Sequence, residues 1–132
     1  APVRLRELAR VELGVEDEAI VRRMTADILK RCGYRVIEAA SGDQALKLWT
    51  TRKFDVDLVL TDLVLPGDVS GLELSRRLAA ARADVRVLFT SGYQGRHDQD
   101  GADFEAGRNF LQKPFGAEQL ATAVRQRLDR PS

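Results

Sequence analysis

The sequence has very little cysteine and no long apolar segment, and each absence excludes a class of protein. Cys32 is the only cysteine among 132 residues. The chain therefore has no internal disulfide and no thiolate metal cluster, which fits a reducing cytoplasm. No apolar stretch approaches the length of a membrane span or a signal sequence. These absences predict a cytoplasmic protein that does not associate with a membrane.

An excess of charge of either sign is also missing. The chain has 21 Lys and Arg residues and 20 Asp and Glu residues, for a net charge of +1. Proteins that bind nucleic acid usually concentrate positive charge on one face, so this balance argues against nucleic acid as a partner. The content of 44% hydrophobic and 31% charged residues is typical of a globular protein, and 132 residues fit one domain.

Five short apolar runs are present, and each is typical of a β-strand. They cover residues 11–15, 34–38, 57–61, 85–90 and 109–112. The third run, DLVLT, contains apolar and β-branched residues without alternation. A strand that is covered on both faces has this pattern, so the sequence predicts a buried sheet.

Segments of helical periodicity separate these runs. In residues 18–32, Ile20, Met24 and Ile28 recur at four-residue spacing with Leu29 beside them, which predicts the buried face of a helix that ends at Gly33. Met24 and Cys32 are expected in the core.

Two capping boxes begin further helices, Ser41 with Gln44 and Ser70 with Glu73. Strands that alternate with helices at these lengths predict βαβ units with right-handed crossovers. Five strands and five helices predict an α/β fold, a doubly wound, five-stranded parallel sheet with helices on both faces.

Polar residues gather where the predicted strands end. Glu16, Asp17 and Glu18 follow the first strand, Asp62 the third, Thr90 and Ser91 end the fourth, and Lys113 follows the fifth. In doubly wound sheets the functional site lies at this edge. Clustered carboxylates repel one another unless a cation lies among them, and such oxygen ligands suit Mg²⁺. A carboxylate beside Mg²⁺ can attack phosphorus, and the phosphoryl oxygens then need donors such as an ammonium and a hydroxyl.

Four segments together resemble the response-regulator receiver domain of two-component signalling. They are GVEDEA (14–19), LVLTDLVLPG (58–67), LFTSGY (88–93) and LQKPF (111–115), in the family's order and spacing. The resemblance covers residues 11 to 129 and implies the flavodoxin-like strand order 2-1-3-4-5. The domain is expected over residues 10–130, after an N-terminal extension or linker at 1–9. The sequences of the last two segments look most like those of receivers attached to hybrid histidine kinases.

The resemblance also implies a role for each residue at the strand ends. Asp62 would be the phosphoacceptor. Mg²⁺, the expected cofactor, would be bound by Asp62, Asp17 and the backbone carbonyl of Val64, with Glu16 holding its water shell.

The remaining implied roles concern the phosphoryl group and the response to it. Lys113 would pair with the phosphoryl oxygens, and the Lys113–Pro114 peptide would be cis. Ser91 and Phe110 would form the switch, and Val64 and Tyr93 would border the approach of the hydrolytic water.

The implied function is a phosphorylation-controlled switch that assists only its own phosphorylation and dephosphorylation. A histidine kinase or phosphotransfer protein would be the partner, and a homodimer stays open. Two alternatives come from other classes. An Mg²⁺-dependent phosphatase with an aspartyl nucleophile needs a second acid two residues later, where this chain has Val64. A pseudo-receiver that only binds partners would not need the complete set of acids, hydroxyl and lysine.

Two features depart from the family. Glu12 and Gly14 leave one face of the first strand without apolar cover, so either Glu12 lies at the strand's open end or residues 3–8 fold back over it. Residues 94–107 should hold a fourth helix, yet they contain three glycines and little apolar content, so we expect them to be mobile. The chain begins with Ala and ends soon after the last helix, as expected of a stand-alone or an excised receiver.

Overall fold

The computed structural model describes residues 10–52, 56–92 and 109–129. Five strands and four helices alternate along these ranges. They are β1 (Val11–Val15), α2 (Ala19–Arg31), β2 (Arg35–Ala39), α3 (Gly42–Arg52), β3 (Leu58–Asp62), α4 (Gly71–Ala81), β4 (Val87–Ser91), β5 (Phe110–Gln112) and α5 (Ala117–Asp129). The helix that the family would have over 94–107 lies outside the described residues. None of the described helices has the length and apolarity that a membrane span requires.

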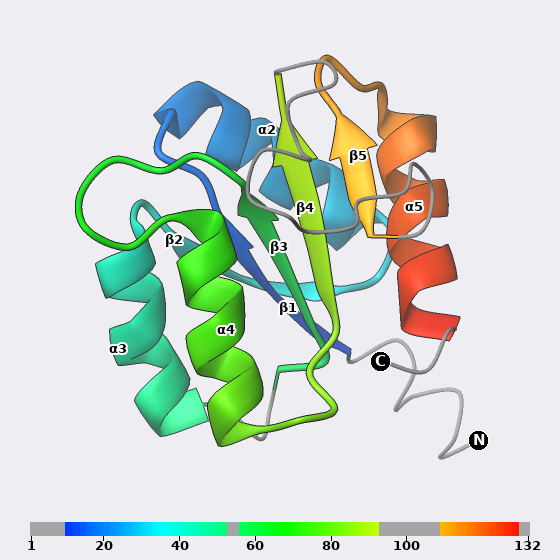
Figure 1. Ribbon diagram of the computed structural model, residues 1–132. Coiled ribbons are helices and arrows are strands. Elements are labelled where there is room, and N and C mark those ends of the chain that lie inside the picture. Colours follow the sequence, from blue (N-terminus) through cyan, green and yellow to red (C-terminus); the bar gives the residue numbers. More distant parts are fainter. Residues whose placement is uncertain (1–9, 53–55, 93–108, 130–132) are drawn as a thin grey trace.

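The five strands form one parallel sheet in the order β2-β1-β3-β4-β5. Helices α3 and α4 cover one face of this sheet, and α2 and α5 cover the other (Figure 1). The doubly wound fold and the strand order 2-1-3-4-5 are thus confirmed. Because all strands run the same way, their carboxyl ends meet at one edge.

The core consists of two apolar clusters, one on each face of the sheet. Beneath α3 and α4 lie side chains that include Leu13, Val59, Phe89, Leu74 and Trp49. Beneath α2 and α5 lie others that include Leu29, Leu58, Leu60, Leu88 and Leu120. All five residues of β3 are buried, as its unalternating sequence predicted.

Both predicted capping serines cap their helices. Gln44 N donates to Ser41 Oγ at 3.1 Å, and Glu73 N donates to Ser70 Oγ at 3.1 Å. Gln44 Oε1 also accepts from the backbone N–H of Ala40 at 2.6 Å. These bonds satisfy backbone donors that a helix start leaves without a partner, which is why the two helices begin at these residues.

The buried face of α2 agrees with the prediction at Leu29 and differs from it at Ile20 and Met24. Ile20 is 84% exposed and Met24 47%, whereas the buried residues of the helix are Thr25, Ala26 and Leu29. The small side chains of Thr25 and Ala26 let the helix pack closely on the sheet, and Ile20 and Met24 lie to one side of that contact. The third residue of the stripe, Ile28, is partly buried and packs against the apolar cluster on this face. The expectation that Met24 and Cys32 belong to the core was wrong, because both are exposed.

Glu12 lies inside the sheet and not at its open end. The side chain is 0% exposed, and the residue pairs with Val36 of β2 and with Leu58 of β3. Within the described residues, neither carboxylate oxygen has a hydrogen-bond partner. The expectation that Glu12 lies at the open end of the strand is therefore wrong. The other expectation, that residues 3–8 fold back over Glu12, concerns residues outside the described ranges.

Candidate functional site

Three carboxylates meet at the carboxyl edge of the sheet. Glu16 and Asp17 directly follow β1, and Asp62 is the last residue of the neighbouring strand β3. One oxygen from each lies within 4.8 Å of the others. Glu16 and Asp62 are 7% and 6% exposed, whereas Asp17 is exposed to solvent. Three hard oxygen donors with one open side suit a cation such as Mg²⁺, which keeps part of its water shell when bound.

Lys113 connects the two buried acids of this cluster. Its Nζ lies 2.7 Å from Glu16 Oε1 and 2.8 Å from Asp62 Oδ1. Burial lowers the pKa of Lys113, but the hydrogen bonds to Asp62 and Glu16 outweigh it and leave the pKa above its ordinary value. The lysine is therefore a cation at neutral pH.

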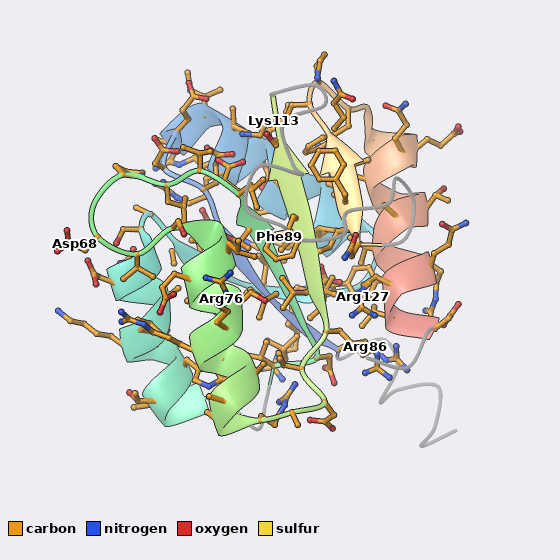
Figure 2. The ribbon with its side chains drawn as sticks, viewed as in Figure 1. Asp68, Arg76, Arg86, Phe89, Lys113 and Arg127 are labelled. Carbon is orange, nitrogen blue, oxygen red and sulfur yellow. The ribbon has the colours of Figure 1, made fainter. Side chains whose placement is uncertain are left out.

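The backbone holds Lys113 in place. Its N–H donates to the carbonyl oxygen of Ser91 at 2.9 Å, directly beyond the paired strands β4 and β5. The Lys113–Pro114 peptide is cis, as the resemblance implied. Figure 2 shows Lys113 at the carboxyl edge of the sheet and Arg86 toward the opposite edge.

Glu16 is fixed by contacts on both sides. Its Oε1 accepts from Lys113, while its Oε2 accepts from the backbone N–H of Glu18 at 3.0 Å. The carbonyl oxygen of Glu16 accepts from Arg22 at 2.8 Å. Since both carboxylate oxygens already have donors, Glu16 is suited to orient metal-bound water, and the exposed Asp17 is the freer of the two to bind a metal directly.

Asp62 has a hydroxyl donor that the sequence did not single out. Thr90 Oγ1 donates to Asp62 Oδ1 at 2.7 Å, and the two residues are partners in the β3–β4 register. The sequence placed Thr90 at the strand end but assigned the hydroxyl role to Ser91 alone. The contact depends on the register of β3 against β4, which was not predicted from the sequence.

Ser91 is the last residue of β4 and Phe110 is the first residue of β5, and both are 5% exposed. Because successive strand residues face opposite ways, Ser91 is on the face of β4 that carries Phe89. Phe89 is in turn the register partner of Phe110. Val64 is 61% exposed, two residues beyond Asp62. Tyr93, the other residue expected near the hydrolytic water, lies outside the described residues.

A close backbone contact positions the loop that follows Asp62. A Cβ atom on Gly71, the first residue of α4, would overlap the carbonyl oxygen of Asp62. The Gly71 N–H donates to the carbonyl oxygen of Leu63 at 2.9 Å. Only glycine permits α4 to begin against the end of β3, so this residue helps to hold Asp62 where the other acids meet it.

Residues 13–125 match the family described as the response regulator receiver domain. The chain belongs to this family. The receiver domain is 38% identical over 116 residues to "Sensor kinase CckA" of Brucella abortus, a match that covers 88% of this chain and 12% of that protein. It is 31% identical over 116 residues to "Sporulation initiation phosphotransferase F" of Bacillus subtilis, covering 86% of this chain and 90% of that protein.

Solved structures agree with these matches. The receiver domain superimposes on the crystal structure of the receiver domain from the hybrid histidine kinase CckA with a TM-score of 0.75 and 34% identity, covering 90% of this chain and 99% of that one. The chain spans only about half the length of the transcriptional regulators that it matches. It is thus a signalling module of two-component systems, a class that interacts with histidine kinases or phosphotransfer proteins.

Proposed function

We propose that this receiver domain accepts a phosphoryl group on Asp62 from a histidine kinase or phosphotransfer protein and transmits the event as a change of conformation. One observation carries the proposal. Asp62 is buried at the end of β3, within 4.8 Å of the oxygens of two other acids, and it shares the ammonium of Lys113 with one of them. An isolated turn carboxylate would have neither neighbour.

The residues divide the chemistry among them. Asp17, Asp62 and the backbone carbonyl of Val64 would hold Mg²⁺, and Glu16 would orient its waters. Bound Mg²⁺ supplies positive charge that offsets the charge on the phosphoryl oxygens. The Asp62 carboxylate attacks phosphorus while the bond from phosphorus to the donor's histidine nitrogen breaks and the imidazole leaves with the electron pair of that bond. Lys113 donates to the phosphoryl oxygens once Asp62 is no longer an anion. The domain assists its own phosphorylation and dephosphorylation and has no other substrate in this proposal.

Other residues would carry the response. Ser91 would move toward the phosphoryl group, and Phe110 would follow on the same side of the sheet. The phosphoryl group can shift this equilibrium only by interacting differently with the two conformations. Val64 and Tyr93 would border the path of the hydrolytic water. The functional unit would be residues 10–130, preceded by a linker at 1–9, in the cytoplasm.

Incubation with Mg²⁺ and acetyl phosphate tests the proposal. The intact protein should gain the mass of one phosphoryl group, and a metal chelator should prevent the gain. Peptide mapping should place the group on the segment that contains Asp62, and hydroxylamine should remove it, as it removes acyl phosphates. No mass gain, or a hydroxylamine-stable phosphate on a serine or threonine, would contradict the proposal.

Replacing Lys113 with Ala is expected to tighten Mg²⁺ binding about tenfold, or ~1.4 kcal/mol. The change removes a cation that competes with the metal for Glu16 and Asp62, and two unit charges 4 Å apart interact by ~4 kcal/mol near a protein surface. Calorimetric titration with Mg²⁺ measures the affinity, and Lys113→Arg, which keeps the charge, is the matched control. Weaker Mg²⁺ binding in the Ala variant would show that Lys113 supports the metal site.

A further inference from the structure

Thr90 stands next to Asp62 with its hydroxyl turned to the carboxylate. The residue is 4% exposed, and its Oγ1 lies 2.7 Å from Asp62 Oδ1. Lys113 Nζ donates to the same oxygen at 2.8 Å. Oδ1 therefore carries two donors, one charged and one neutral.

Packing alone does not require a hydroxyl at this position. Leu88, two residues earlier on the same face of β4, is 0% exposed within the apolar cluster under α2 and α5. Thr90 itself lines a small cavity with Leu60 and Phe115. Valine has the shape of threonine and would suit these neighbours, so the contribution of the hydroxyl is its bond to Asp62.

We propose that Thr90 is a positioning residue that shortens the lifetime of the phosphorylated state by stabilising Asp62 as the leaving carboxylate. The inference rests on the proposed function. The phosphoryl group joins Oδ2, because Oδ1 already accepts from Thr90 and Lys113. Oδ1 then becomes the carbonyl oxygen of the acyl phosphate, and Thr90 remains its donor.

The strength of this bond changes during the loss of the phosphoryl group. The oxygen of a water molecule forms a bond to phosphorus while the bond from phosphorus to Oδ2 breaks. The electron pair of that bond stays on Asp62 as a carboxylate, and inorganic phosphate leaves while one proton of the water passes to solvent. Hydrogen bonds to an ionised acceptor are roughly twice as strong as those to a neutral one. The bond from Thr90 therefore strengthens as the negative charge returns to Asp62.

Removal of the Thr90 hydroxyl should affect the formation and the hydrolysis of the acyl phosphate differently, because the transition state is loose. In a loose transition state the Asp62 oxygens carry most of the charge of a free carboxylate. The Thr90 bond is then nearly the same in the carboxylate and in the transition state, and weaker only in the acyl phosphate. Removing the hydroxyl should slow loss by about three- to tenfold, the difference between a charged and a neutral hydrogen bond. Formation should change by only about twofold or less.

The experiment measures both rates for the whole chain with acetyl phosphate at constant Mg²⁺. Formation is followed by intact mass, and loss is followed after the phosphodonor is removed. Thr90→Val and Thr90→Ala remove the hydroxyl in a larger and a smaller side chain, and Thr90→Ser restores it. Thr25→Val is the matched control, because Thr25 is a buried threonine that lines the same cavity from α2.

Slower loss in the Val and Ala variants, with wild-type rates in the Ser and Thr25→Val proteins, supports the inference. Loss at the wild-type rate in the Val and Ala variants would overturn it, and so would slower formation without slower loss. If the wild-type protein took up no phosphoryl group at all, the proposed function would fall and this inference with it. A domain that is phosphorylated but indifferent to Thr90 would overturn the inference alone.

Discussion

Replacing Asp62 with Asn is expected to abolish phosphorylation while the fold stays intact. Asn keeps the shape of the side chain, and its amide oxygen can still accept from Thr90 and Lys113, the two donors that Oδ1 has now. The amide is neutral and is not a nucleophile toward phosphorus, and it takes one negative charge from the group of three acids. The rate with acetyl phosphate should therefore fall below detection.

The control is Asp68→Asn, which makes the same chemical change in an exposed aspartate of the loop after β3 (Figure 2). This variant should be phosphorylated like the wild-type protein. Far-ultraviolet circular dichroism and thermal unfolding should show that both variants are folded. A folded Asp62→Asn protein that still gained an acyl phosphate at the wild-type rate would show that another carboxylate is the acceptor.

The sheet and the edge that carries the site were predictable because they depend on local patterns. The unalternating run of β3 can be stable only between two layers of helices, and a parallel sheet brings its strand ends together. Asp62 ends one strand, and Asp17 and Lys113 come directly after two others, so their meeting follows from the topology alone. The contacts of Lys113 with Glu16 and Asp62 agree with that reasoning.

The features that the sequence misplaced depend on tertiary packing. The stripe of Ile20 and Met24 has the correct helical spacing, but the buried residues of the helix lie beside it, and of these only Leu29 was predicted. Thr90 was overlooked for a similar reason, since its contact with Asp62 depends on the register of β3 against β4. A periodic pattern shows that a helix or strand has a buried face, but it does not show which neighbour that face meets.

The environment of Glu12 also could not be predicted from the sequence. The sequence marked it as unusual in a central strand, and the structure shows an entirely buried carboxylate. The pKa of Glu12 is raised from 4.5 to about 8. Burial is the largest cause, the negative charge of Asp57 acts in the same direction, and Arg10 and Arg125 oppose the change. The carboxyl group is therefore neutral in the folded protein at neutral pH and ionised in the unfolded chain.

Replacing Glu12 with Gln is expected to stabilise the protein increasingly as the pH rises from 4.5 to 8. Below pH 4.5 the carboxyl is protonated in both states and contributes no pH dependence. Above it the unfolded chain loses a proton that the folded protein keeps, so the free energy of unfolding of the wild-type protein falls until the pH passes the folded pKa of about 8. The free energy of unfolding of the wild-type protein falls in total by on the order of 5 kcal/mol, of which about 3 kcal/mol is lost by pH 7.

Gln cannot ionise, so the free energy of unfolding of the Glu12→Gln protein should not fall with rising pH for this reason. Urea unfolding of both proteins at several pH values between 4.5 and 8.5 gives the difference between their free energies of unfolding. The contributions of the other titrating groups are common to both proteins and cancel in this difference. Glu118→Gln, at an exposed position of α5, is the matched control and should give a nearly constant difference. Because domains of this size are stable by only about 5–15 kcal/mol, the Glu12 effect should be large. A difference for Glu12→Gln that stayed flat across this range would mean that Glu12 ionises in the folded protein as readily as in the unfolded chain.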